Sequence, residues 1–593
     1  MEDYGKLKSG TDIRGRAIAS EGGPAVLTEK AVRALASAFA FWLSERTGKP
    51  RIKLAIGRDS RTTGPTFARA IIAALRKCGI EMYDCGLFST PAAFMVTQFP
   101  SMSVDGSIMI TASHHPSDIN GLKFFTREGG VNSAELSEII ELANNGAHIK
   151  PCTLSSVVCR DFMRLYCDKL TDAIRKGTGV FLPLKGMRIV VDAGHGAGGF
   201  FAARVLAPLG ADISASQFLE PDGTFPAHPP NPENAEAMES LKNRVLESGA
   251  DLGIIFDADV DRCAIVSSDG TEINRCRLIA LASAMILSEQ PGATIVTDSV
   301  TTEGLRRFIE SRGGVQKRFK RGYRNVIDEA KRLCDSGINA PLAIESSGHA
   351  AFKEHYFLDD GAYFIVKILI EYAKLRRSGS DLVDLIADLE VPVEEGDVRL
   401  NFVSADWRNV ADKIITRLNA MSERMLKLSD DNYEGVRAYV SYADGYFIVR
   451  TSVHDPVLPI YMESNKIGGT AKIAKFLYSF LSGFIGLDCA PLYDYIEAHT
   501  FDSYSTDDYS AQDDYAEEPA RDEPEGDYDE NADIYSDEYA YDEGPSDEYA
   551  GEYAEEYDDE AGETDEYIDE TGAYAPSDDI DIDYDKPIDE SSF

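Results

Sequence analysis

One hydrophobic pattern recurs three times along the chain. A short apolar run enters a turn that contains Asp, a segment with helical periodicity follows, and a glycine precedes the next apolar run. The copies span Lys53–Gly79, Met187–Gly210 and Ala293–Gly314. Strands separated by single helices predict βαβ units with largely parallel pairing. The glycine after each helix fits a left-handed C-cap.

These copies predict an α/β fold with three similar domains, which have mixed, largely parallel sheets, followed by a smaller C-terminal α+β domain. We expect α/β domains at 1–155, 175–272 and 273–390, with a helix from Asp161 to Ile174 joining the first two. The α+β domain is expected at 391–492. Its predicted elements are a strand at Val398–Phe402, a helix at Trp407–Met421, and strands at Arg437–Tyr442 and Tyr446–Thr451 around the hairpin turn Ala443-Asp444-Gly445.

Charge separates the C-terminal segment from the rest of the chain. The net charge of the 593 residues is −42, and residues 501–593 hold 38 acidic residues but only two basic ones. From Asp494 onward aliphatic residues are too few to offset the entropy of folding, so 494–593 is predicted to be a disordered acidic tail. A solubilising role is the simplest interpretation. The thirteen tyrosines of residues 501–593 leave open a docking segment for a basic partner or a weak cation-binding tail.

Compartment and membrane association follow from cysteine usage and hydropathy. The nine cysteines are scattered without a Cys-x-x-Cys pair, which favours reduced thiols and a cytoplasmic protein. The first residues lack the apolar core of a signal peptide. Residues Ala474–Leu487 are too short and too interrupted to cross a bilayer and are predicted to form a packed amphipathic helix. Neither a membrane nor a nucleic acid is expected as a partner.

Residues Thr111–Pro116, Thr-Ala-Ser-His-His-Pro, follow the apolar run Ser107–Ile110. A strand that ends in a polar turn displays side chains at the carboxyl edge of the sheet, where open α/β sheets bind ligands. Ser113 followed by His114 is therefore a candidate nucleophile or phosphate carrier. A turn that proline merely rigidifies is the alternative for this hexapeptide alone.

Three aspartates follow the apolar run Leu252–Phe256. In an extended loop Asp257, Asp259 and Asp261 point to one side and converge on a hard cation. The loop lacks the glycine and glutamate of a calcium EF-hand, so a Mg²⁺ site open to a phosphate oxygen fits better. Arg262 adds a phosphate contact. A merely solvated turn is disfavoured because the three charges repel one another.

Two further strand ends have polar loops. Glu345, Ser347 and His349 follow the apolar run Leu342–Ile344, and Glu with Ser can hydrogen-bond vicinal sugar hydroxyls. A capping glutamate at a helix start is an equally good interpretation. Arg450, Ser452 and His454 follow the predicted strand near Tyr446, where arginine, hydroxyls and turn amides suit a phosphate. By itself this last loop is an ordinary turn.

Taken together, the motifs resemble the α-D-phosphohexomutase family, in its phosphomannomutase/phosphoglucomutase branch. The resemblance covers residues 5–490 in collinear order. It rests on Thr111–Pro116 with Asn120–Lys123, on Asp257–Arg262, on Glu345–His349 with Asp359–Gly361, on Arg450–Pro456 and on His228–Glu233.

The resemblance implies a phosphohexose mutase that interconverts hexose 1- and 6-phosphates of mannose and/or glucose. Ser113 is implied to be the phosphoserine, which shares a Mg²⁺ with Asp257, Asp259 and Asp261, and a hexose 1,6-bisphosphate is implied as activator. Lys123 and His114 match acid/base and phosphate-stabilising positions, and Arg14 and Arg262 add positive charge. Glu345 and Ser347 match sugar-hydroxyl readers, and Arg450 and Ser452 match the loop that holds the non-reacting phosphate.

An acid/base role for Lys123 near neutral pH would need a lowered lysine pKa, which a crowded cationic cleft could supply.

The chain departs from the family pattern at several positions. His115 replaces an expected Asn, Tyr323 stands where a substrate-contacting His is common, and Val453-His454 replaces Gly-Thr or Asn-Thr in the phosphate loop. Substrate identity is therefore open. Phosphoglucosamine and phosphopentose mutases are alternatives, as is a scaffold protein that acts through its acidic tail.

Overall fold

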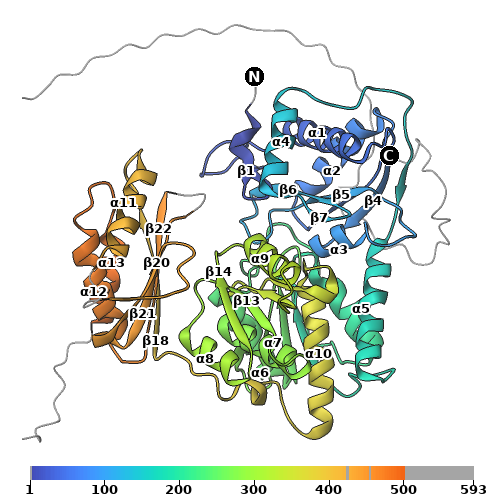
Figure 1. The fold of residues 1–593 in the computed structure, drawn as a ribbon. Coiled ribbons are helices and arrows are strands. Elements are labelled where there is room, and N and C mark those ends of the chain that lie inside the picture. The colour runs from blue at the N-terminus through green and yellow to red at the C-terminus, as the bar shows by residue number, and fades with distance from the viewer. Residues whose placement is uncertain (1–2, 422–425, 453–455, 501–593) are drawn as a thin grey trace, which may run out of the picture. The chain divides into compact units, whose positions relative to one another are not determined.

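The computed structural model describes residues 3–421, 426–452 and 456–500 (Figure 1). The acidic residues from 501 onward and His454 lie outside the described residues. The described chain contains three α/β domains with mixed sheets and a further sheet in the C-terminal region, which confirms the predicted fold class. None of the described helices is both long and apolar enough to cross a bilayer.

The first domain is built on an eight-stranded sheet of order β1-β2-β6-β5-β3-β4-β8, with β7 paired to β6. β3, β4, β5 and β8 run parallel to one another, while β6 is antiparallel to both β5 and β2. The strands are β1 Lys8–Ser9, β2 Asp12–Arg16, β3 Lys53–Arg58, β4 Glu81–Leu87, β5 Gly106–Ile110, β6 Ile119–Thr126, β7 Gly129–Gly130 and β8 Val157–Cys159. The domain boundaries stay predictions, and β8 extends this sheet to Cys159.

Helices cover both faces of this sheet (Figure 1). Helices α1, α2 and α4 share one apolar core with the sheet, whereas α3 and α5 pack on the other side. The bounds are α1 Glu29–Thr47, α2 Gly64–Arg76, α3 Thr90–Met95, α4 Ser133–Asn144 and α5 Phe162–Thr178. Their ends follow capping rules. Thr28 and Ser89 cap N-termini with their hydroxyls, and Asn132 forms a capping box with Glu135.

The second domain has the sheet order β12-β11-β10-β9, in which only β9 and β10 are parallel. Its elements are β9 Ile189–Asp192, α6 Ala235–Ser248, β10 Leu252–Phe256, β11 Cys263–Ser267 and β12 Glu272–Ile273. Strands β10 and β11 are buried on both faces. Their hairpin contains the three aspartates.

The third domain has the order β14-β13-β15-β16-β17, with β13 parallel to both β14 and β15. Its elements are α7 Arg275–Glu289, β13 Thr294–Asp298, α8 Glu303–Ser311, β14 Val315–Phe319, α9 Tyr323–Asp335, β15 Leu342–Ile344, β16 Ala350–Phe352, β17 Leu358–Asp359 and α10 Gly361–Ser378. The third predicted strand–helix copy is thus present.

The C-terminal region has an antiparallel sheet of order β18-β22-β21-β20-β19 with helices on one face (Figure 1). Its elements are β18 Glu394–Asn401, α11 Trp407–Asn419, β19 Lys427–Leu428, β20 Val436–Val440, β21 Gly445–Val449, β22 Val457–Ser464, α12 Gly469–Leu481 and α13 Ala490–His499. The predicted hairpin turn is present, and Asp444 adopts φ +44°.

The linker helix is more than a connection between domains. α5 packs along α10 so closely that a Cβ on Gly177 would come within 2.6 Å of Ile370. Buried residues of α5, α7 and α10 belong to one apolar core that also includes β9 and β10. Elements of the first three domains therefore contribute to one apolar core.

Two sequence predictions were wrong in detail. The helix expected to end at Gly210 is a π-helical turn, Phe201–Leu206, between two 3₁₀ turns, because Pro208 cannot continue an α-helical ladder. The tail does not begin at Asp494. Residues 494–499 complete α13, whose Leu492 and Ile496 are buried, so local apolar spacing outweighs the acidic composition there.

Candidate active site

The phosphoserine candidate lies in a strained turn just after β5. Ser113 is buried and adopts φ +54°, a left-handed conformation that is uncommon for serine. Its amide donates to Thr111 Oγ1 at 2.9 Å, and its hydroxyl donates to Asp257 Oδ2 at 2.8 Å. His114 Nδ1 lies 3.2 Å from the same hydroxyl. The turn therefore aims Ser113 Oγ at the aspartate loop of the second domain.

A fully buried arginine that the motif analysis did not single out holds this turn. The guanidinium of Arg61 donates to the carbonyls of Ser113, His115, Pro116 and Ile119 at 2.5–2.7 Å. Asp59 Oδ2 lies 3.2 Å from its Nε and also accepts from Thr111 Oγ1. The available signal was Asp59-x-Arg61 after β3, a strand that neighbours β5 and ends at the same sheet edge.

The three aspartates converge as predicted, although the loop is not extended. Ligand atoms of Asp257, Asp259 and Asp261 lie within 4.8 Å of one another, and all three residues are buried. Val260 adopts φ +69° in a tight turn, which replaces the extended geometry assumed from the sequence. One oxygen each of Asp259 and Asp261 is buried without a hydrogen-bond partner. Such orphaned oxygens fit a hard cation.

The carboxylates of this loop perturb one another. Burial raises the pKa of Asp257 well above its ordinary value, and the negative charges of Asp261 and Asp259 add to the effect. The pKa of Asp261 is instead held well below its ordinary value, because Lys123 and His349 outweigh the effect of its burial.

Lys123 lies between the aspartates. Its Nζ is 3.1 Å from Asp259 Oδ2 and 2.6 Å from Asp261 Oδ2. Burial alone would lower its pKa, but the two carboxylates raise it well above the ordinary value. The lowered lysine pKa that an acid/base role near neutral pH would need is therefore not found, because anions and not cations are its nearest neighbours.

The other predicted cations are both partnered. Arg14 on β2 pairs with Asp12 at 2.9 Å. Arg262 donates its amide to Asp257 Oδ1, and its Nη1 lies 3.2 Å from Glu233 Oε2. The Nε of Arg262 is 3.9 Å from both Asp257 and Asp261. Arg262 thus reaches the carboxylates that face Ser113.

The loop after β15 meets the metal loop. His349 Nε2 lies 3.4 Å from Asp261 Oδ1, and its Nδ1 lies 3.0 Å from Ser347 Oγ. Glu345 Oε1 accepts from the amide of Gly322 at 2.6 Å, so it is a loop anchor and not a helix cap. Tyr323 stacks on His349 with ring centroids 5.3 Å apart. The carboxylates of Asp261 and Glu345 outweigh burial and raise the pKa of His349 to about 9.

The phosphate loop of the C-terminal region is described in part. Arg450 directly follows β21, and its amide donates to the carbonyl of Pro459; the amide of Ser452 donates to that of Val457. Burial lowers the pKa of Arg450, and the charge of Arg321 lowers it further. The predicted role of His454 stays a prediction.

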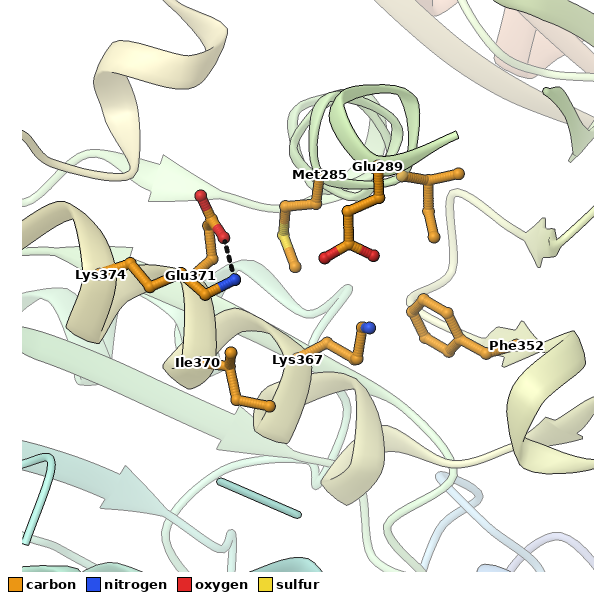
Figure 2. A pocket seen from close by; sticks show the side chains of 8 residues that line it. Met285, Glu289, Phe352, Lys367, Ile370, Glu371 and Lys374 are labelled. Atoms are coloured by element: carbon orange, nitrogen blue, oxygen red, sulfur yellow. Dashed lines mark hydrogen bonds and ion pairs between the residues drawn. The ribbon is translucent and has the colours of Figure 1, made fainter. Parts of the chain in front are cut away.

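Of two cavities in the structure, one is lined by predicted site residues and the other is not. A cavity of about 20 Å³ between α7 and α10 is lined by Met285, Glu289, Phe352 and Lys367, among others, and contains none of the predicted site residues (Figure 2). A second cavity, of about 40 Å³, is lined by Lys123, Tyr323 and Asp359. Only the second borders the catalytic candidates.

The first three domains match family models. Residues 5–149, 164–270 and 276–389 match phosphoglucomutase/phosphomannomutase α/β/α domains I, II and III, in that order. The three matches cover more than half of the chain and fall in the order that the motifs predict.

Individual proteins agree with this assignment. The chain is 29% identical over 434 residues to a phosphomannomutase/phosphoglucomutase of Pseudomonas putida, covering 72% of this chain and 88% of that protein. It is 28% identical over 416 residues to a phosphoglucomutase of Neisseria gonorrhoeae, covering 70% and 85%. A crystal structure of a phosphoglucomutase/phosphomannomutase family protein from Burkholderia thailandensis superposes with a TM-score of 0.67 at 26% identity, covering 81% and 98%.

These findings confirm the resemblance seen in the motifs. The chain belongs to the α-D-phosphohexomutase family, in its phosphomannomutase/phosphoglucomutase branch, and is a phosphohexose mutase, an isomerase-type phosphotransferase.

Proposed function

We propose that this phosphohexose mutase interconverts the 1- and 6-phosphates of mannose and/or glucose through a phosphoserine at position 113. The supporting observation is that Ser113 Oγ lies against the buried carboxylates of the metal loop, 2.8 Å from Asp257. A serine in this place can exchange a phosphoryl group with a sugar hydroxyl that enters from the sugar-loop side.

Each half-reaction exchanges one P–O bond for another. The phosphoryl group leaves Ser113 Oγ and bonds to the free hydroxyl oxygen of the hexose phosphate, which gives a hexose 1,6-bisphosphate. The proton of that hydroxyl is replaced, and Ser113 Oγ gains a proton as its P–O bond breaks. After the bisphosphate turns over, its other phosphoryl group returns to Ser113. A hexose 1,6-bisphosphate added from outside would also charge the serine, which is why we propose it as activator.

The carboxylate trio supports Mg²⁺ as the cofactor. The oxygen-only donor set and the orphaned oxygens of Asp259 and Asp261 fit a hard divalent cation. We propose that Asp257, Asp259 and Asp261 hold it together with the Ser113 side chain. When bound, the ion neutralises charge on the transferring phosphoryl group.

Proton and charge roles follow from the surroundings of each base. Burial lowers the pKa of His114 far below its ordinary value, and nearby cations add to the effect. His114 is therefore neutral, and its ring nitrogen Nδ1 lies at hydrogen-bond distance from the Ser113 hydroxyl. Lys123 remains charged, so we assign it to charge stabilisation and proton donation. Arg14 and Arg262 add positive charge around the transferring group.

The sugar is proposed to lie against the loop after β15. Glu345, Ser347 and His349 are buried there beside Tyr323, and they present carboxylate, hydroxyl and imidazole groups to vicinal hydroxyls. Arg450, Ser452 and His454 are proposed to hold the phosphate that does not react.

Initial rates with four substrates test this function. Mannose 1-phosphate, glucose 1-phosphate, glucosamine 1-phosphate and ribose 1-phosphate are compared by kcat/KM, with Mg²⁺ and a trace of glucose 1,6-bisphosphate. We expect the two neutral hexoses to exceed the other sugars. A preference for glucosamine or ribose phosphate would overturn the proposed substrate class.

A second experiment compares the 593-residue protein with a variant that ends at Thr500, just after α13. It distinguishes an enzyme from a scaffold protein that acts through its acidic tail. Equal kcat/KM is expected, because the proposed catalytic groups precede the tail. Loss of turnover on truncation would contradict that expectation.

A further inference from the structure

Arg321 occupies the turn between β14 and α9, and none of the motifs assigns it a role. The next residue, Gly322, adopts φ +115° and donates its amide to Glu345 of the sugar loop. Arg321 itself donates its amide to Glu434 Oε1 at 3.0 Å. Two consecutive backbone amides of this turn are therefore hydrogen-bonded to carboxylates, and these bonds fix the backbone position of Arg321.

The guanidinium of Arg321 forms ion pairs with two carboxylates. Its Nη2 lies 3.3 Å from Glu233 Oε1, and its Nε lies 3.9 Å from Asp298. Asp298 already accepts hydrogen bonds from the amide and the hydroxyl of Ser346. Arg321 Nη1 donates no hydrogen bond to any residue within 3–421, 426–452 or 456–500. The side chain is 24% exposed, so the free N–H groups are accessible to a ligand.

Glu233 is shared between two arginines. Its Oε2 lies 3.2 Å from Arg262 Nη1 on the metal loop, while its Oε1 faces Arg321. One half-buried carboxylate thus serves two guanidiniums.

Arg321 also lies beside the phosphate loop. Glu434, which accepts from the Arg321 amide, precedes Gly435, where a Cβ would approach Arg450 Cα to 2.6 Å. Burial lowers the pKa of Arg450, and the positive charge of Arg321 contributes to the lowering. Like charges are brought together in a partly desolvated place at a cost that a bound anion removes.

We propose that Arg321 is a further substrate-binding residue, which pairs with Arg450 on the phosphate of the hexose phosphate that is not being transferred. A guanidinium presents a planar fork of N–H groups that matches phosphate oxygens. This inference rests on the proposed function, because it takes the bound anion to be the substrate's own phosphate. Glu233 then acts as a counter-ion in the unliganded cleft.

Arg321→Gln tests the proposal, with Arg332→Gln as the matched control. Arg332 is an exposed arginine on α9 that pairs with Glu329, outside the cleft. In steady-state assays we expect Arg321→Gln to raise KM for glucose 1-phosphate about 10- to 100-fold, the range of a lost charge-assisted hydrogen bond, with kcat within about threefold. Arg321→Lys should recover part of the loss. Arg332→Gln should match the wild type.

A binding experiment tests the role of Arg321 independently of turnover, so that a failure of this inference can be distinguished from a failure of the proposed function. Inorganic phosphate and glucose 1-phosphate are titrated calorimetrically into Ser113→Ala protein with and without Arg321→Gln. Both ligands should bind at least about tenfold more weakly to the double variant. Equal binding, or a fall in kcat at unchanged KM, would overturn the role of Arg321. Absence of turnover by the wild type would defeat the proposed function, while the phosphate titration would still decide whether Arg321 binds an anion.

Discussion

The hydroxyl of Ser113 donates a 2.8 Å hydrogen bond to Asp257, which lies 144 positions later in the chain. The bond joins the loop after β5 to the loop after β10, so two domains complete one site. It places the proposed phosphate carrier against the proposed metal ligands without any intervening residue. The predictions below depend on that juxtaposition.

The first prediction concerns Arg61, which fixes the serine turn. Its guanidinium is fully buried and donates to four carbonyls of residues 113–119. In Arg61→Lys a single ammonium cannot reach all four, so unsatisfied carbonyls remain next to Asp59. We expect a loss of about 3 kcal/mol in stability, seen as a lower apparent Tm, and a kcat lower by at least about tenfold.

Arg69→Lys is the control for this variant. Arg69 lies on α2, close in sequence, and is exposed, with its guanidinium donating to Thr66 Oγ1. It should keep wild-type Tm and kcat. If Arg61→Lys behaved like this control, the turn would owe its conformation to other contacts.

The second prediction concerns the three buried carboxylates. In EDTA they repel one another, as the raised pKa of Asp257 indicates. Adding Mg²⁺ should therefore raise the apparent Tm of the wild-type protein, because the ion binds the folded state. Asp257→Asn should lose most of this Mg²⁺-dependent rise and lower kcat on the order of 100-fold. Differential scanning fluorimetry over a Mg²⁺ titration measures the first effect.

Asp257→Asn also tests whether the charge of Asp257 destabilises the folded protein when no metal is bound. In EDTA we expect Asp257→Asn to be at least as stable as the wild type, because it removes one of three clustered charges. A strongly destabilised variant without metal would show instead that the Asp257 carboxylate contributes net stability to the folded protein.

The third prediction concerns pH and His349. Asp261 and Glu345 raise the pKa of this buried histidine to about 9 in the metal-free protein, from an ordinary value of 6.5. The folded state therefore holds a proton that the unfolded chain releases between these values. The resulting stability is fully present below pH 6.5 and lost as the pH rises through about 9, at about 1.4 kcal/mol per pH unit.

Thermal unfolding from pH 6 to pH 10 in EDTA measures this dependence. His349→Gln should be less stable than the wild type at pH 6 but show a flatter profile between pH 6.5 and pH 9. Parallel profiles for the two proteins would mean that His349 does not carry the bound proton.

Much of the site was predictable because chemistry-bearing residues follow apolar runs directly. Ser113, Asp257, Glu345 and Arg450 all come within three residues of a strand end. The carboxyl ends of strands are where such sheets bind ligands, so the order of motifs alone indicated one site. The same local signal located the domain-joining helix, whose N-cap is Asp161.

What the sequence did not predict depends on contacts between distant segments. Arg61 bonds to carbonyls more than 50 positions away, and carbonyl positions leave no trace in side-chain pattern. The raised pKa of Lys123 could not be predicted because its carboxylate partners lie 136 and 138 positions away in another domain. The π-helical turn at Phe201–Leu206 and the ordered residues 494–499 are different, because they depend on local packing.

The most direct test of the account is to follow one phosphoryl group. Dephosphorylated enzyme is incubated with glucose 1,6-bisphosphate and Mg²⁺, and its intact mass and phosphopeptides are measured before and after glucose 1-phosphate is added. The account predicts a single added phosphoryl group on Ser113, still present after turnover because the other phosphoryl group of the bisphosphate returns to the serine, and neither phosphorylation nor turnover in Ser113→Ala. Turnover that persists in Ser113→Ala, or a phosphoryl group on another residue, would contradict it.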